Sequence, residues 1–344
     1  MKILILALFV SNLAYSVGIS LGDQPSKILK NYSNLFISLP LAGNIQDKTL
    51  GWPGGHWQSN LGSISHRWSS NDPEIFTYSY RSLEELKTTP QYLIDAMSPA
   101  EKLSIYQRDY NYKLVDKIRS QYSVDENDWH GICHGVAAAQ MNHGEPQKKI
   151  VTNRDGIKIE FYSSDLKGLI SYYYANISNA KAVQTGLRCH SSDSRNIDCQ
   201  GINPATFHLV LANKIGLDRK PFIADIDRGL EVWNQVAIAF NSYIVDEYPV
   251  NANADPRAVK MIRVQTEVTF ESSIQPTFGP VIGTDLAEYL HNNYDYYLEI
   301  DNYGDVIGGQ WISDLRPDFL FLRDKAKFNG DWADLLNLYN PIRP

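Results

Sequence analysis

The 344-residue sequence predicts an α+β fold, in which helices come first and a mostly antiparallel sheet follows. From about residue 80 the chain carries helix start signals and apolar residues at helical spacing. Its second half carries short apolar runs that are separated by turn residues, as in strands. The chain is also 43% hydrophobic and 21% charged, which allows a packed core in one large domain or two smaller ones.

The first residues predict export from the cytosol. Lys2 is followed by the apolar run Ile3 to Val10 and then by Ala14-Tyr15-Ser16, a site of small residues. We expect residues 1–16 to be a signal peptide, with an uncleaved anchor as the alternative, and the mature protein to be secreted or periplasmic. No later apolar stretch is long enough to span a membrane. The net charge of −7, without a basic run, argues against nucleic acid as a partner.

The sequence predicts an irregular and partly helical N-terminal region over residues 17–95 and a catalytic domain over residues 96–344. Up to about residue 75 the chain is rich in Gly, Pro, Ser and Trp and shows no repeat. Ser98 then begins a helix, because it can cap the helix, Pro99 suits the first helical position and Glu101 stands three residues on.

Further elements follow in order along the chain. Helices are predicted around Leu114–Ile118, from Cys133 onward and over Leu166–Tyr174, and a hairpin over Ile150–Ile159. Strands are predicted over Pro221–Ile226, Glu231–Trp233, Met261–Val268, Tyr296–Ile300 and Asp305–Ile307. The segment Asn203–Gly216 fits either a capped helix or a strand from Phe207 to Ala212, and the sequence leaves that choice open.

Cys133 is the candidate nucleophile. Cys189 and Cys199 share one polar loop, and in an exported protein we expect them to form a disulfide, which leaves Cys133 unpaired. Cys133 stands where a glycine-bearing turn enters a helix of small residues. Unpaired N–H groups at a helix start favour a thiolate, so we expect a lowered pKa and nucleophilic catalysis. The alternative interpretation is a buried structural thiol.

The sequence also suggests partners for the thiol. Among eight histidines, His208 is the candidate general base, because His134 would point away from Cys133 on a helix. Asp225, a carboxylate in an otherwise apolar strand, is the candidate that orients the base. Asp227 and Asn234 remain rivals for that role. The Cys133 N–H together with the side chain of Asn127 or Trp129 would form an oxyanion pocket.

Several short motifs in the same order resemble the transglutaminase elicitors of oomycetes and their bacterial relatives. Trp129–Gly135 is similar to the family segment W-x-G-[IL]-C-H, and Glu231–Gln235 to the start of its peptide V-W-N-Q-P-V-R-G-F-K-V-Y. Gly308–Trp311 and Pro317–Leu320 are similar to its G-G-x-W and P-D-F-L elements, and Ser98–Lys102 fits an upstream segment. The matches lie between about residues 95 and 322. Val236, Ile238 and Ala239 depart from the peptide, which weakens the implication of elicitor activity.

The resemblance implies a papain-like core, in which the nucleophile helix packs on the sheet, and a protein-glutamine γ-glutamyltransferase activity. Cys133, His208 and Asp225 would be catalytic, and Trp129, Asn127, Trp233 and Asn234 would bind substrate. The partners would be proteins that supply glutamine and lysine side chains. No metal site or cofactor is implied, and a calcium requirement is left open. A papain-like peptidase or amidase and a non-catalytic secreted binding protein are the alternatives.

Overall fold

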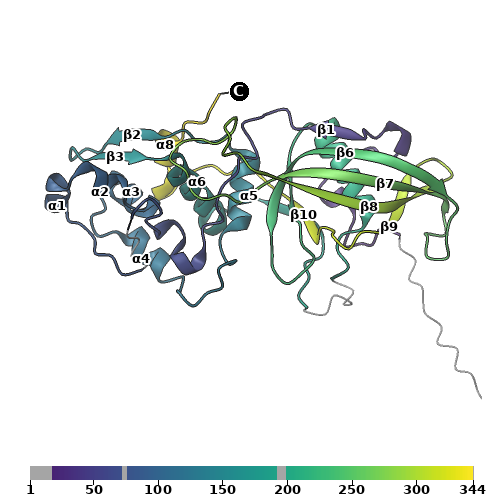
Figure 1. Ribbon diagram of the computed structural model, residues 1–344, viewed down its shortest axis with the longest axis horizontal. Coiled ribbons are helices and arrows are strands. Elements are labelled where there is room, and N and C mark those ends of the chain that lie inside the picture. Colours follow the sequence, from purple (N-terminus) through teal and green to yellow (C-terminus); the bar gives the residue numbers. More distant parts are fainter. Residues whose placement is uncertain (1–17, 72–75, 192–198, 344) are drawn as a thin grey trace, which may run out of the picture.

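Helices and sheet occupy opposite ends of the molecule in the computed structural model (Figure 1). The structure describes residues 18–71, 76–191 and 199–343. The predicted signal peptide and the tip of the cysteine loop lie outside these residues. Long strands connect the two ends and bend over where they are farthest from the helices (Figure 1). In the described ranges, no helix has the length and apolarity that a membrane crossing requires.

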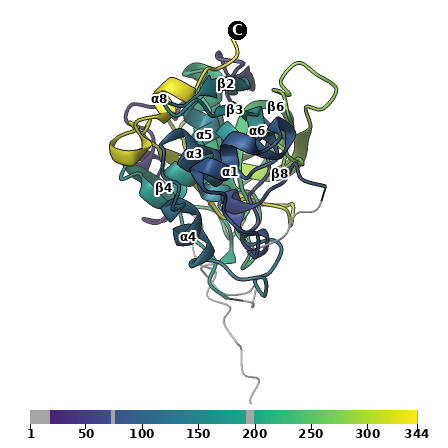
Figure 2. The same ribbon diagram turned by 90° about the vertical axis from the view of Figure 1, so that its left-hand side faces the viewer.

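The helical end is built mainly from residues 83–177 and is seen face-on in Figure 2. Its helices are α1 (Leu83–Thr88), α2 (Gln91–Asp95), α3 (Pro99–Tyr106), α4 (Lys113–Arg119), α5 (Cys133–Asn142), α6 (Ser163–Tyr172) and the C-terminal α8 (Leu335–Leu338). The predicted start at Ser98 is confirmed, because Ser98 and Glu101 form a reciprocal capping box at α3. The hairpin β2 (Lys149–Thr152) and β3 (Lys158–Phe161) is also confirmed, and it turns at Gly156 with φ +84°.

The remaining strands form one eight-stranded sheet, and its established pairs are all antiparallel. In spatial order they are β4 (Ala182–Gly186), β10 (Phe319–Arg323), β5 (Phe222–Asp225), β6 (Asn234–Tyr248), β7 (Ala258–Glu271), β8 (Tyr289–Asp301) and β9 (Val306–Trp311), with β1 (Ala42–Asn44) beside β6. The predicted α+β class is thus confirmed. One strand prediction is wrong, because residues 231–233 lie in the loop before β6. The segment Asn203–Gly216, for which the sequence left helix and strand open, is helical. It forms α7 (Pro204–Val210), which is followed by a π-helix over Leu211–Leu217.

The sheet carries a hydrophobic cluster on each face. Helix α5 packs against β5 and β6, and its cluster includes Ile223 and Val236. Helix α7 packs against β8 and β9, and its cluster includes Phe222 and Ala237. Because neighbouring strand residues point to opposite faces, the alternation of these four residues places α5 and α7 on opposite sides of the sheet.

Residues 18–95 contribute to both clusters. Ile28 and Leu39 join the cluster around α7, whereas Trp52 and Ile64 join the cluster around α5 and α6. Strand β1 extends this contribution by pairing with β6. The boundary that the sequence suggested at residue 95 stays a prediction.

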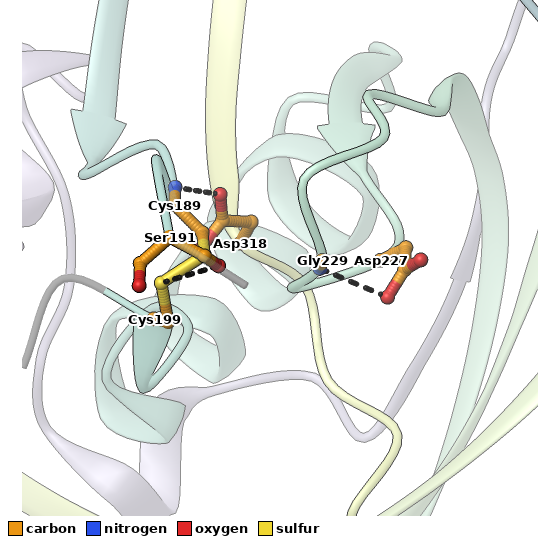
Figure 3. The surroundings of a disulfide bond; sticks show 6 residues. All are labelled: Cys189, Ser191, Cys199, Asp227, Gly229 and Asp318. Atoms are coloured by element: carbon orange, nitrogen blue, oxygen red, sulfur yellow. Dashed lines mark hydrogen bonds between the residues drawn. A yellow bond between two sulfur atoms is a disulfide. The ribbon is translucent and has the colours of Figure 1, made fainter. Parts of the chain in front are cut away.

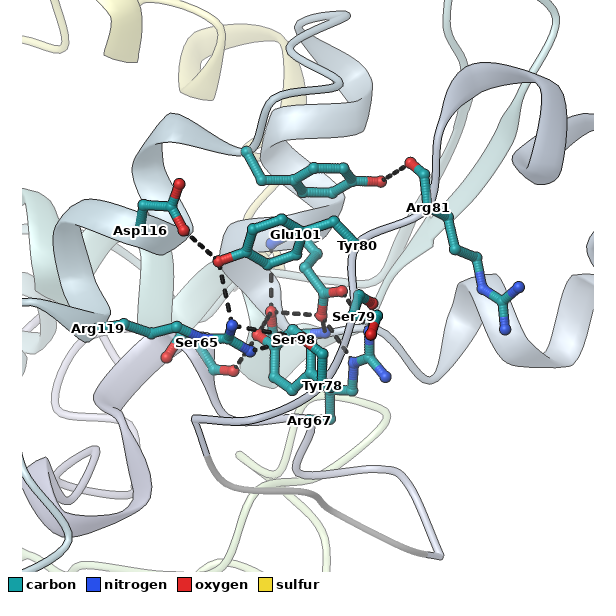
Figure 4. A network of polar contacts seen from close by, with 11 residues as sticks. Ser65, Arg67, Tyr78, Ser79, Tyr80, Arg81, Ser98, Glu101, Asp116 and Arg119 are labelled. Carbon is teal, nitrogen blue, oxygen red and sulfur yellow. Dashed lines mark hydrogen bonds and ion pairs between the residues drawn. The ribbon is translucent and has the colours of Figure 1, made fainter.

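A polar network attaches the segment before α1 to the helical end (Figure 4). The Tyr78 ring lies between two guanidinium groups, 3.7 Å from Arg67 Cζ and 3.8 Å from Arg119 Cζ. Arg67 also makes two hydrogen bonds to Glu101, and Glu101 accepts hydrogen bonds from the Ser98 backbone and hydroxyl. The capping box of α3 therefore also holds the preceding segment in place.

Candidate active site

Cys133 begins helix α5 and is a free thiol, whereas Cys189 and Cys199 form the predicted disulfide. The turn before it is fixed by the Ile132 N–H, which donates to His56 O at 2.9 Å. Gly131 is required there, because a Cβ would lie 2.4 Å from the same His56 oxygen. Because Gly131 and Ile132 lie this close to the His56 backbone, the chain is fixed where it enters α5 at Cys133.

Two groups from the loop and start of β6 contact the thiol. Cys133 Sγ donates to Val232 O at 3.4 Å, and Asn234 Nδ2 donates to Sγ at 3.5 Å. The thiol opens on a cavity of about 520 Å³. Its wall includes Trp129 and His130 before the helix, Gln184 and Arg188 near β4, and Phe319 and Phe321 on β10. This cavity has the size of a small-molecule or side-chain pocket.

The expectation of a lowered thiol pKa is wrong. Burial raises the pKa of Cys133, and the negative charge of Asp225 raises it further. Hydrogen bonds from Asn234 and from the His134 backbone act in the opposite direction but do not outweigh burial. The resting thiol is therefore protonated at neutral pH, and its reaction needs a neighbouring base rather than a free thiolate.

Asp225 is the carboxyl group whose negative charge acts on this thiol. It ends β5 and faces Asn234 across the β5–β6 ladder, so both side chains share the face on which α5 packs. Asp225 Oδ1 accepts the Trp233 N–H at 2.9 Å, whereas Oδ2 is buried without a hydrogen-bond partner among the described residues. Burial raises the pKa of Asp225 to about 7. Such a group can exchange a proton near neutral pH.

His208 does not reach Cys133, and the prediction that it is the base is corrected. Helix α7 carries His208 on the opposite side of the sheet, where its Nδ1 shares a hydrogen bond of 2.9 Å with Tyr296 Oη. Its ring also stacks against Phe36, and burial lowers its pKa to about 4. His208 is thus part of the packing around α7.

The other predicted site residues divide into two groups. Trp129 and Asn234 line the cavity, and their contact with substrate stays a prediction. Asn127 is exposed and Trp233 lies outside the cavity wall, where its indole donates to Glu231 Oε2 at 3.1 Å. The rival Asp227 is exposed and accepts the Gly229 N–H at 3.1 Å.

Sequence reasoning missed charged groups near the thiol, among them Glu126 and Arg188. Glu126, His130 and Arg188 line the cavity, and His130 Nδ1 lies 3.5 Å from Glu126 Oε2. Asp318, in the P-D-F-L segment that resembles the family, donates its N–H to Asp225 O at 2.9 Å. The motif was visible in the sequence, but only the β5–β10 pairing shows that its aspartate adjoins Asp225. Within the described ranges, no group of three or more His, Cys, Asp or Glu side chains is arranged to hold a metal ion.

Comparisons with known proteins give one family match and one similar solved structure. A family described as transglutaminase elicitor matches residues 33–331. Among solved structures, the chain is similar to the GP42 transglutaminase from Phytophthora sojae, with a TM-score of 0.68 and 22% sequence identity over 90% of this chain and 93% of that chain. At this identity the likeness establishes the fold alone, and curated proteins give no match. Because the family match spans most of the 344 residues, the chain belongs to the transglutaminase elicitor family.

Proposed function

We propose that the protein is a secreted protein-glutamine γ-glutamyltransferase, which joins glutamine side chains to primary amines through a cysteine thioester. The observation that carries this proposal is the free thiol of Cys133 in the wall of a cavity, with Asn234 on the sulfur and the buried Asp225 opposite Asn234 in the β5–β6 ladder. Membership of the transglutaminase elicitor family supports the reaction class. The packing of α5 on β5 and β6 is compatible with the papain-like core that we propose, which is an analogy at the level of fold.

In the first half of the reaction, Cys133 Sγ attacks the side-chain amide carbon of a glutamine. The Asp225 carboxylate accepts the thiol proton as the C–S bond forms, and then donates it to the leaving ammonia. A carboxyl group with a pKa of about 7 suits both steps, because it is neither a very weak acid nor a very weak base at neutral pH. Asn234 Nδ2 and the first backbone N–H groups of α5, which have no side-chain cap, are donors for the developing oxyanion.

In the second half, a lysine amine attacks the thioester carbon, and the C–S bond breaks. Asp225 accepts a proton from the amine and returns it to the sulfur, so Cys133 is restored as a thiol. Transfer rather than hydrolysis requires that water be kept from the thioester. The aromatic side chains of Trp129, Phe319 and Phe321 in the cavity wall support this requirement.

Secretion is the second part of the proposal. The disulfide between Cys189 and Cys199 fits an oxidising compartment, in which such bonds persist. Residues 1–16 have the pattern of a signal peptide but lie outside the described part of the chain. Mass spectrometry of the exported protein would show whether the mature N-terminus follows Ser16.

The test follows three products in parallel: a fluorescent primary amine bound to a glutamine-bearing protein, free ammonia, and new protein N-termini. We expect wild type to release ammonia and incorporate the amine without new N-termini. Cys133→Ala is expected to abolish both products, and Asp225→Asn to reduce them by ~10²–10⁴-fold, the usual effect of a general base. Asp227→Asn serves as the control, because it removes an exposed carboxylate of the same loop.

Each of the other outcomes would assign a different activity to the protein. New N-termini without isopeptide product would identify a peptidase. Ammonia without amine incorporation would identify an amidase. A thiol that resists iodoacetamide in the native protein, together with no product, would identify a non-catalytic binding protein.

A further inference from the structure

The wall of the Cys133 cavity carries an acidic side chain that none of the proposed catalytic steps uses. Glu126 and Trp129 both line the cavity, and both lie in the segment that leads into α5. The Glu126 side chain is 30% exposed, so a ligand can reach it from solvent. Within the described ranges its carboxylate contacts one ionic group, His130, whose Nδ1 lies 3.5 Å from Oε2, and no lysine or arginine.

The segment that carries Glu126 is anchored by hydrogen bonds from an earlier part of the chain. The Ser59 N–H donates to His130 O at 2.9 Å, and Gln58 Nε2 donates to Asp128 O at 2.9 Å. Ser59 lines the cavity as well. The backbone on both sides of the Glu126 segment is therefore held at the cavity rather than in a free surface loop.

We propose that Glu126 and Trp129 form the binding site for the ammonium group of the acceptor amine. This inference rests on the proposed transferase function, and it specifies how that function selects a cationic acceptor. A carboxylate attracts an ammonium ion by charge, and the face of an indole attracts it through its quadrupole. The side chain of the glutamine donor carries no charge, so this part of the wall favours the acceptor over the donor.

Arg188 brings a charge of the opposite sign to the same cavity. It precedes Cys189, whose disulfide and hydrogen bond to Asp318 hold the chain in place (Figure 3). Arg188 follows β4, whereas Glu126 precedes α5, so the two charges reach the cavity from different elements. A cation in the cavity is attracted by one of them and repelled by the other. Removal of either charge therefore has opposite effects on the same cationic probe.

The test uses the Cys133 thiol to report the charge around it. Two methanethiosulfonate reagents, one with a trimethylammonium group and one with an uncharged methyl group, form a disulfide with the thiol and release methanesulfinate. Cys133 is the free cysteine of the oxidised chain, so the readout needs no transferase activity. Each rate is divided by the rate of the same reagent with 2-mercaptoethanol. The quantity compared is the ratio of the cationic to the neutral rate.

Three variants are compared with wild type at low salt. Glu126→Gln is expected to lower the ratio by ~3–10-fold, near the lower limit of the effect of a charged cleft on association rates. Arg188→Gln is expected to raise it. Asp125→Asn is the matched control, because Asp125 is exposed, adjacent in sequence and outside the cavity wall, and it should leave the ratio within about twofold. The effect of Glu126→Gln should shrink in about 0.5 M NaCl, since salt screens the carboxylate.

A second measurement compares two acceptors in wild type and Glu126→Gln. A fluorescent derivative of cadaverine is cationic at neutral pH, whereas hydroxylamine is uncharged there and forms a hydroxamate with the same thioester. We expect the variant to raise KM for the cadaverine derivative by ~3–10-fold and to leave KM for hydroxylamine within about twofold. An equal rise for both acceptors overturns the inference, because Glu126 would then act on the site as a whole.

The two measurements separate this inference from the proposed function. An unchanged reagent ratio in folded Glu126→Gln overturns the inference, even if wild type transfers amines. A lowered ratio without any hydroxamate or amine product supports the cation site and rejects the transferase reaction. If Glu126→Gln does not fold, wild type decides: a ratio above one that falls with salt supports the inference, and a ratio that salt does not lower overturns it.

Discussion

Replacement of Glu271 by Gln is expected to stabilise the protein at alkaline pH. Glu271 ends β7 and is only 2% exposed, and the Gln235 amide donates to its backbone oxygen at 3.0 Å and also to its carboxyl group. The carboxyl group also interacts with Gln140 on α5. Glu271 thus lies between the helix that begins with Cys133 and the strand that begins with Asn234.

The magnitude follows from the pKa of Glu271, which burial raises from 4.5 to about 8. The folded state therefore binds the proton more tightly than the unfolded state. This contribution to stability is complete below pH 4.5 and is lost as the pH rises to about 8. The largest loss is ~5 kcal/mol at 1.36 kcal/mol per pH unit. Gln carries no charge at any pH, so Glu271→Gln avoids the loss.

Urea denaturation followed by tryptophan fluorescence at pH 5 and pH 9 measures the effect. We expect the variant to match wild type within about 1 kcal/mol at pH 5 and to exceed its free energy of unfolding by ~1–5 kcal/mol at pH 9. Glu267→Gln, on the same strand but half exposed, is the control and should show no such pH dependence. Equal differences at both pH values would refute the reasoning, because the effect would not come from ionisation.

Three further predictions concern the site and its supports. His208→Gln is expected to lower the free energy of unfolding by about 1 kcal/mol, because it weakens the hydrogen bond to Tyr296. The same variant should leave turnover within about threefold of wild type. Urea denaturation measures the first effect and steady-state kinetics the second. Gly131→Ala is expected to slow thiol alkylation and turnover at unchanged secondary structure, because its Cβ would collide with His56 O at 2.4 Å. Replacement of both Cys189 and Cys199 by Ser should lower the free energy of unfolding by about 2–3 kcal/mol, a modest loss because the closed loop is short. An unchanged midpoint of urea denaturation would contradict this.

The elements that the sequence predicts well depend on local signals. The start of α3 follows from a cap, a proline and a glutamate within four residues, and the hairpin around Gly156 follows from its turn. The disulfide follows from the location of two cysteines in one loop. Cys133 at the start of α5 also follows from its immediate neighbours.

The errors concern relations between distant segments. Helix α7 is buried along its whole length, so its sequence does not reveal which face of the sheet His208 occupies. The pKa of Cys133 depends on its burial and on Asn234, which lies about a hundred residues further along the chain. The pairing of Asp225 with Asn234 depends on the β5–β6 register, which the sequence does not specify.

The loop between β5 and β6 is closed at its base independently of its own sequence. The Ile226 N–H donates to Trp233 O at 3.1 Å, and the Trp233 N–H donates to Asp225. Residues 227–232 can therefore change in length and composition while Asp225 and Asn234 stay paired. Since Val232 reaches the cavity, variation of this loop can change the cavity wall without replacing Asp225 or Asn234. For engineering, this makes the loop the natural position for a randomised library.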